Sequence, residues 1–158
     1  MRFEKISKGQ FYTDNVGLYI DYDDIKLPTR ATTKSAGYDI FAVTDIVLNP
    51  GESIKLPTGI RVLVDDDKFL AVFPRSGLGF KYRVQLDNTI GVIDADYYDS
   101  DNEGHIWLKL TNDSKNPDNV MFVKKGTAVC QGIILQYFKT EDDNVTEIRN
   151  GGFGSTTK

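Results

Sequence analysis

Residues 74–79 combine side chains that suit phosphate binding. They read Pro-Arg-Ser-Gly-Leu-Gly and follow an apolar stretch. The guanidinium is a planar fork for phosphate oxygens, the hydroxyl adds a donor, and the glycines let backbone N–H groups approach an anion. A tight turn with a surface Arg explains the same residues, so this segment alone leaves both interpretations open.

Residues 91–97, Gly-Val-Ile-Asp-Ala-Asp-Tyr, place two carboxylates beside an aromatic ring. They follow Asn88-Thr89-Ile90, an approach suited to a β-hairpin. One carboxylate could orient a water molecule as a general base. An acidic turn with a tyrosine packed at its base is the structural alternative.

Residues 149–156 and Gln131 are further candidates for nucleotide binding when they are considered together with these two segments. Residues 149–156 read Arg-Asn-Gly-Gly-Phe-Gly-Ser-Thr after a polar, acidic stretch at 140–146. Such a segment is expected to be mobile when alone, either as a frayed terminus or as a lid over a bound nucleotide. Gln131 could contribute a side-chain amide, or it could be a strand residue that faces solvent.

The elements that must position these groups are predicted to be strands. Ile106, Leu108 and Leu110 alternate with polar or amphipathic residues, as in a half-buried strand. Short β-branched or aromatic runs at 54–56, 60–64, 69–73 and 133–138 are bounded by turn residues. The turns are expected at 50–51, 57–59, 65–68 and 124–126. This spacing indicates a sandwich or barrel with at most one short helix.

Composition narrows the class of protein. A length of 158 residues fits one domain. A net charge of −4 argues against a surface that grips nucleic acid, although a local cluster of cations could bind a small polyanion. The single cysteine, Cys130, cannot form an internal disulfide, and we find no signal peptide or membrane span. We therefore expect a cytoplasmic protein without a membrane partner.

Five segments resemble, in order, the five signature motifs of the trimeric dUTP diphosphatases (dUTPases), in the form found in Gram-positive bacteria and their phages. The resemblance covers about residues 27–156, and the motifs match residues 35–40, 74–79, 91–97, 125–131 and 149–156. It implies an all-β, jelly-roll-like β-barrel that forms a homotrimer. Residues 1–158 would be a single dUTPase domain, with 140–158 a flexible C-terminal arm exchanged between subunits.

The resemblance also implies an activity: conversion of dUTP and water to dUMP and pyrophosphate by in-line attack of water at the α phosphorus. Asp94 would activate the water as the catalytic residue, and Asp39 would support the site structurally. Mg²⁺ would be the cofactor, held through the substrate phosphates and not by protein ligands. The substrate-binding residues implied are Arg75, Ser76, Gly77, Asn88, Gly91, Val92, Ile93, Tyr97, Trp107, Gln131, Arg149, Phe153, Gly154 and Ser155.

The chain departs from the family pattern after Tyr97, where a longer acidic loop at 99–104 looks solvated. His105 in this region is expected at the surface or in a trimer contact, and we assign it no role in the mechanism. A related dCTP deaminase or bifunctional deaminase-diphosphatase is one alternative. Those enzymes place a catalytic Glu on the strand that matches residues 106–112, whereas this chain has Lys109 there. A second alternative is a dUTPase homologue that acts through a regulatory protein partner.

Overall fold

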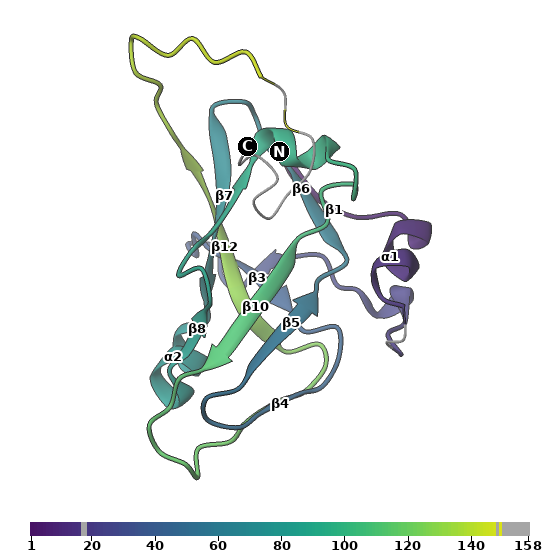
Figure 1. Cartoon of the computed structure of the whole chain (residues 1–158), viewed down its shortest axis with the longest axis vertical. Helices are drawn as coiled ribbons and strands as arrows, with labels where there is room; N and C mark the ends of the chain where they lie inside the picture. The colour runs from purple at the N-terminus through teal and green to yellow at the C-terminus, as the bar shows by residue number, and fades with distance from the viewer. Residues whose placement is uncertain (17–18, 148, 150–158) are drawn as a thin grey trace.

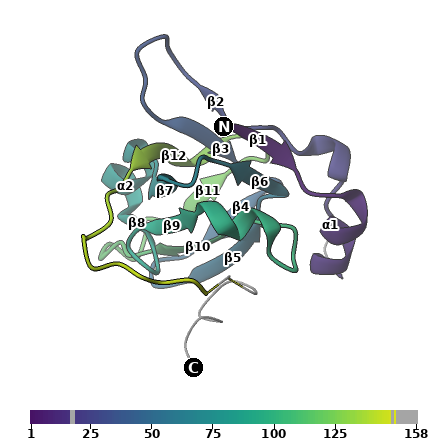
Figure 2. The ribbon, with the colours of Figure 1, turned by 90° about the horizontal axis from the view of Figure 1, so that it is seen from above.

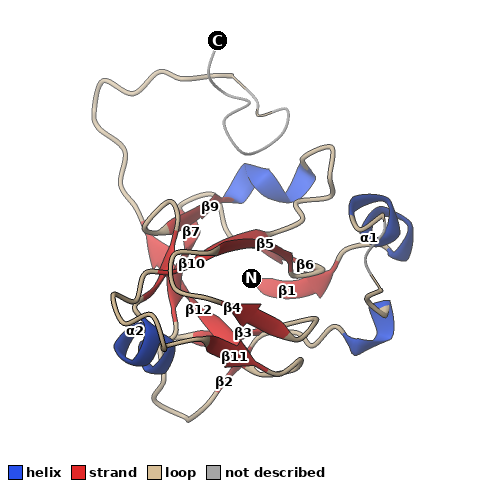
Figure 3. Ribbon diagram, turned by 60° about the horizontal axis from the view of Figure 1, so that its bottom comes forward, coloured by secondary structure: helices blue, strands red, loops and turns tan. Residues whose placement is uncertain are grey.

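Strands dominate this chain, and its helices lie outside them (Figure 1, Figure 3). The computed structural model describes residues 1–16, 19–147 and 149. Within these residues the elements are β1 (Arg2–Lys5), α1 (Lys8–Asp14), the 3₁₀ helix η1 (Tyr22–Asp24), β2 (Thr29–Arg30), β3 (Tyr38–Phe41), β4 (Ile46–Leu48), β5 (Ser53–Pro57), β6 (Ile60–Leu63), β7 (Lys68–Pro74), α2 (Ser76–Tyr82), β8 (Val84–Leu86), β9 (Gly91–Asp94), the 3₁₀ helix η2 (Ala95–Asp99), β10 (Trp107–Asn112), β11 (Met121–Val123) and β12 (Ala128–Gln136).

Antiparallel pairing joins strands that are far apart in the chain. The largest sheet has the order β2-β3-β12-β7-β9, and a second has the order β5-β10-β8. β1 pairs with β6, and β4 pairs with β11. Because β12 lies between β3 and β7, and β10 between β5 and β8, the sheets wrap around a common interior as in jelly-roll folds. The expected all-β, jelly-roll-like class is confirmed.

One hydrophobic core lies between these sheets. In β10 the alternation is as the sequence predicted, with Leu108 and Leu110 buried and Lys109 exposed. Leu70 and Val72 of β7 enter the same core. Burying one such side chain completely stabilises the fold by roughly 1.5–3 kcal/mol, so a strand that slipped by one residue would lose several such contributions.

Most of the predicted strands and turns are confirmed. The runs at 54–56, 60–64 and 69–73 correspond to β5, β6 and β7. The run at 133–138 belongs to β12, which begins earlier, at Ala128, and ends at Gln136. Gly51, Gly59 and Gly126 have positive φ angles of 87°, 70° and 77°, as turn glycines do.

The expectation of at most one short helix was wrong. The described residues contain α1 and α2, each of seven residues, and two 3₁₀ helices. α2 begins at Ser76, inside the segment whose alternatives were a phosphate loop and a turn. Seven residues make only two turns, so neither helix shows the apolar stripe that identifies a longer helix.

The N-terminal segment (residues 1–16) packs into the main core. β1 pairs with β6, and Ile6 and Phe11 are completely buried among the core residues. α1 starts after Ser7, whose hydroxyl accepts a hydrogen bond from the Gln10 N–H at 3.1 Å. Figure 2 shows α1 on one flank of the molecule and α2 on the other. No helix in the described part of the chain is long and apolar enough to cross a membrane.

Candidate active site

A pocket of about 410 Å³ opens between β9, η2 and β10. Its walls are mainly apolar side chains and strand backbone, which is typical of small-molecule sites. It contains many of the residues that the resemblance marked for substrate binding. The lining residues are Val72, Leu86, Asp87, Asn88, Gly91, Val92, Ile93, Asp94, Tyr97, Ile106, Trp107, Leu108, Lys109 and Arg149.

The predicted hairpin forms one wall of the pocket. β8 ends at Leu86, whose carbonyl accepts a 2.8 Å hydrogen bond from the Thr89 N–H. Thr89 has a φ of 68°, and the Ile90 N–H then donates to the Asn88 carbonyl at 2.7 Å. β9 follows and pairs with β7, with Gly91 opposite Val72. Strand backbone and the Asn88 side chain are therefore held at the pocket wall.

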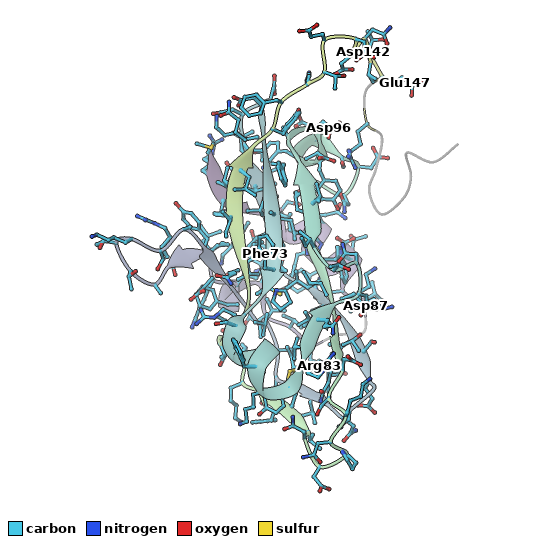
Figure 4. The ribbon with its side chains drawn as sticks, turned by 90° about the vertical axis from the view of Figure 1, so that its left-hand side faces the viewer. Phe73, Arg83, Asp87, Asp96, Asp142 and Glu147 are labelled. Atoms are coloured by element: carbon cyan, nitrogen blue, oxygen red, sulfur yellow. The ribbon has the colours of Figure 1, made fainter. Side chains whose placement is uncertain are left out.

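Asp94 and Asp96 bind the same cation at the pocket rim. Arg149 forms an ion pair with Asp94, and its Nε lies 2.9 Å from the Asp96 Oδ1. Figure 4 shows Asp96 at the end of the molecule where Asp142 and Glu147 of the C-terminal arm also lie. About half of the Asp94 and Asp96 side chains is exposed, so water reaches both carboxylates.

Tyr97 closes the inner end of the pocket. Its hydroxyl donates to the His105 carbonyl at 2.8 Å and accepts from the Asn102 side-chain amide at 2.9 Å. Only 5% of the residue is exposed, and this burial raises the pKa of the phenol. The ring is therefore a neutral wall with a fixed orientation.

The opposite wall carries a charged pair. The Lys109 Nζ lies 2.7 Å from the Asp87 Oδ2, and Thr111 also donates to this carboxylate. The hydrogen bond from Lys109, followed by that from Thr111, lowers the pKa of Asp87. Asp87 and Lys109 line the pocket although the sequence interpretation gave neither a binding role.

A second cluster surrounds Arg75. This guanidinium forms an ion pair with Asp39, and Asp39 pairs in register with Gln131 across β3 and β12. A Cβ atom on Gly37 would lie only 2.6 Å from the Gln131 Oε1, so the glycine leaves room for this amide. Ser76 and Gly77 follow in the first turn of α2. Residues of three predicted motifs, 35–40, 74–79 and 125–131, thus meet here although they are far apart in the chain.

The Arg75 cluster and Asp94 lie at opposite ends of β7. Phe69 pairs with Asp94, and Arg75 follows six residues later, about 20 Å along an extended strand. In Figure 4, Arg83, at the end of α2, lies at the opposite end of the molecule from Asp96. Within one chain, Arg75 is therefore remote from Asp94.

Two expectations about the 99–105 region were wrong. Ser100 and Gly104 are buried, so the loop is not simply solvated. His105 is completely buried and does not lie at the surface. A Cβ atom on Gly104, which has a φ of 68°, would come within 2.8 Å of the Tyr97 carbonyl. The loop folds tightly under Tyr97 because a glycine stands at this position.

Several remaining expectations concern metals and the terminal motif. In residues 1–16, 19–147 and 149, no group of three or more His, Cys, Asp or Glu side chains is arranged to hold a metal ion. Phe153, Gly154 and Ser155, which the resemblance marks for substrate binding, lie outside the described residues.

Comparisons with known proteins point to one family. A sequence model of the dUTPase family matches residues 23–157. The deoxyuridine 5'-triphosphate nucleotidohydrolase of Lactococcus lactis is 38% identical over 135 residues, covering 84% of this chain and 88% of the relative. The crystal structure of the dUTPase from Streptococcus mutans matches with a TM-score of 0.70 at 29% identity, over 89% of this chain and 99% of that one.

A phage protein shares the fold. A dUTPase of Staphylococcus bacteriophage 80alpha, solved with dUPNHPP, matches with a TM-score of 0.66 at 22% identity, over 98% of this chain and 96% of that one. The family match spans all five motifs, and the Lactococcus relative is alike over most of both chains. This chain therefore belongs to the dUTPase family.

Proposed function

We propose that this chain hydrolyses dUTP to dUMP and pyrophosphate. The observation that carries the proposal is a single pocket in which a hairpin backbone, a buried tyrosine and an exposed carboxylate come together. These three features match the three parts of the reaction, namely recognition of the base, recognition of the sugar and activation of water. Membership of the dUTPase family gives the proposal its substrate.

The hairpin accounts for the choice of base. Backbone N–H and carbonyl groups of residues 91–93, with the Asn88 amide, can pair with the polar edge of uracil. Cytosine presents a different donor pattern, and the methyl group of thymine needs space beside the wall. Polar groups left unpaired in such a pocket disfavour the wrong base by orders of magnitude.

The tyrosine accounts for the choice of sugar. In the proposal, the Tyr97 ring packs against the deoxyribose and leaves no space for a 2'-hydroxyl. A ring excludes an extra atom only when it cannot move aside. Its two hydrogen bonds, to the His105 carbonyl and from Asn102, hold it in place.

The chemistry needs a base next to the α phosphorus. Asp94 orients and deprotonates the attacking water, opposite the pyrophosphate leaving group. Arg75, Ser76, Gly77 and Gln131 bind the phosphates and stabilise the developing charge. Arg149, together with Phe153, Gly154 and Ser155, closes over the phosphate chain.

We infer that one active site needs more than one chain. Reacting atoms must lie within about 3.5 Å of each other, yet Arg75 and Asp94 of one chain are separated by most of β7. A second copy would bring its Arg75 cluster to the pocket, and a third would contribute residues 140–158 as an exchanged arm. A homotrimer with three such sites satisfies this requirement.

Mg²⁺ fits this proposal as a partner of the substrate. When bound with the substrate, the ion would offset the negative charge of the triphosphate. The oxygen ligands would be mainly those of the triphosphate. This chain's part is to position that triphosphate with Arg75, Ser76 and Gln131.

We further propose the cytoplasm as the site of action, and residues 1–158 as one dUTPase domain. The deaminase alternative gains no support: Lys109 occupies the relevant position and pairs with Asp87. A regulatory protein partner remains a hypothesis that no contact described above favours.

The test compares pyrophosphate release from dUTP, dTTP, dCTP and UTP in Mg²⁺, by the parent chain and by Asp94→Asn. We expect turnover of dUTP alone, and a loss of at least about a thousandfold in kcat for the variant, as when a catalytic group is removed. Similar rates on all four nucleotides, or an unaffected variant, would reject the assignment. Release of ammonia from dCTP would instead support the deaminase.

A further inference from the structure

α1 lies outside the family match, which begins at residue 23, yet its Asp14 contacts the buried His105, which precedes the pocket residues Ile106 and Trp107. The Asp14 Oδ2 lies 2.6 Å from the Nδ1 of His105. The Gly59 N–H donates to the other ring nitrogen, Nε2, at 3.0 Å. Because Nε2 accepts a hydrogen bond, the proton of the neutral ring is on Nδ1 and points to Asp14.

Asp14 is itself held in place. The Gln10 side-chain amide donates to its Oδ1 at 2.8 Å. A second link joins the start of the same helix to the loop, because the Ser7 N–H and hydroxyl donate to the Glu103 carboxylate at 2.6 and 2.7 Å. α1 is thus attached to residues 103 and 105 at both of its ends.

His105 contacts two walls of the pocket. Its carbonyl accepts the hydrogen bond of Tyr97, and its ring lies 4.9 Å from the Trp107 ring, centroid to centroid. The Lys55 Nζ also lies over the Trp107 ring, 4.3 Å from its centroid, in a cation–π contact. A displacement of His105 as a whole would therefore disturb Tyr97 through the carbonyl and Trp107 through the ring.

We propose that Asp14 is a positioning residue for nucleotide recognition, which fixes His105 and through it Tyr97 and Trp107. The proposal rests on the function proposed above, since that function assigns Tyr97 to the sugar, and Trp107 lines the same pocket. Residues 1–16 would then contribute to the choice between nucleotides. The reacting groups Asp94 and Arg75 touch neither Asp14 nor His105 in any contact described here, so substrate binding should change more than the chemical step.

Steady-state kinetics on the full chain test this. For Asp14→Ala we expect KM for dUTP to rise about tenfold with kcat within about twofold, the pattern of lost ground-state binding. The preference for dUTP over UTP should fall by a similar factor. Asp14→Asn keeps an oxygen that accepts from Nδ1 and should recover most of the loss. Thr13→Ala, an exposed change on the same helix, is the matched control and should match the parent.

A second measurement does not depend on turnover. Trp107 is the only tryptophan of the chain, so its emission reports on this wall alone. We expect acrylamide to quench it more strongly in Asp14→Ala than in the parent, Asp14→Asn or Thr13→Ala. If the parent hydrolyses no dUTP, the proposed function fails, while quenching still decides whether Asp14 holds the wall.

Unfolding midpoints identify a variant that fails to fold. Should Asp14→Ala do so, Gln10→Ala replaces it, because this change loosens Asp14 without removing it, and KM should rise about two- to threefold. The proposal is overturned if the folded Asp14→Ala protein, or Gln10→Ala in its place, has the KM, the UTP discrimination and the Trp107 quenching of the parent.

Discussion

Arg149 forms an ion pair with the proposed catalytic carboxylate, Asp94. An ion pair between exposed groups contributes only about 0.2–1 kcal/mol, and both carboxylates here are about half exposed. Charge-assisted hydrogen bonds to a phosphate are worth about 1.5–3 kcal/mol each. In the proposed trimer the Arg149 at each site comes from another copy, and a bound triphosphate can draw it away from Asp94 and free the base for water.

Replacing Arg149 should show this exchange. We expect Arg149→Ala to lower kcat/KM for dUTP about a hundredfold, the effect of losing one donor to the reacting phosphates. Arg149→Lys should recover only part, because an ammonium lacks the planar fork. Asp96→Asn, the matched control, should stay within about threefold. An Arg149→Ala protein as active as the control would show that Arg149 does not serve the phosphates.

The hydroxyl and the ring of Tyr97 have separable effects. Tyr97→Phe keeps the ring but removes the 2.8 Å hydrogen bond to the buried His105 carbonyl, so the free energy of unfolding should fall by about 1–2 kcal/mol. The preference for dUTP over UTP should largely remain, whereas Tyr97→Ala should lose it. Urea unfolding and competition between the two nucleotides measure these effects. A Tyr97→Ala protein that still rejects UTP would contradict the role of the ring.

The contact between α1 and the 99–105 loop should depend on pH. Burial lowers the pKa of His105 below 6.5, although the hydrogen bond that His105 donates to Asp14 opposes this. Above pH 6.5 the residue is neutral in both folded and unfolded chains. As the pH falls below 6.5, only the unfolded chain takes up a proton on this histidine. The free energy of unfolding therefore falls, by up to about 1.4 kcal/mol per pH unit, until the pH reaches the lower pKa of His105 in the folded chain.

Unfolding curves at pH 7.5 and 5.5 measure this loss. We expect the parent to be less stable at pH 5.5, and His105→Gln to lose much less between the two values. Glu4 acts in another window: hydrogen bonds from Tyr98 and Arg2 lower its pKa to about 2, so its contribution is lost only as the pH falls from 4.5 towards 2. A parent with equal stability at both values would contradict the assignment to His105.

The strands could be predicted from the sequence, and the short helices could not. Alternation identified β10, and turn residues bounded β5, β6 and β7. α2 contains Gly77 and Gly79, which disfavour a helix, and its form depends on tertiary contacts. α1 had one usable signal: Ser7 followed by Gln10 resembles a capping box.

The two halves of the site differ in how far the sequence reveals them. The hairpin and Asp94 are local, and their motif is contiguous. The His105 environment is not local, since Asp14 lies 91 positions away. A lone histidine in an acidic loop reads as exposed, and only the docking of α1 buries it. Long-range partners of this kind leave no pattern within a window of neighbouring residues.

At the scale of the whole molecule, the division of the site is the main constraint. Asp94 at the pocket rim and Arg75 are separated by about 20 Å along β7 of one chain, which is the basis of the proposed shared site. Exposed apolar side chains accompany both, including Val92 on β9 and Phe80 on α2. Their burial between copies would stabilise a trimer, since each buried Å² of apolar surface contributes about 25 cal/mol.

Mixing two inactive variants tests the shared site. Asp94→Asn lacks the base and Arg75→Ala lacks the phosphate fork, so each should be nearly inactive alone. If Asp94 of one chain works with Arg75 of another, trimers refolded from an equal mixture should recover about a quarter of the parent activity, because about one site in four takes both intact residues. A mass measurement should show three chains in the active species.

Two controls test whether activity recovered in the mixture comes from sites shared between chains. Variants that carry both substitutions, mixed with either single variant, contain no chain pair that restores a site, and should stay inactive. Preformed trimers mixed without unfolding should recover only as fast as chains exchange. If each site were complete within one chain, both inactive variants would remain inactive in every mixture. No recovery from correctly assembled mixed trimers would therefore mean that Arg75 and Asp94 of the same chain serve one site, and would remove the basis for the shared site.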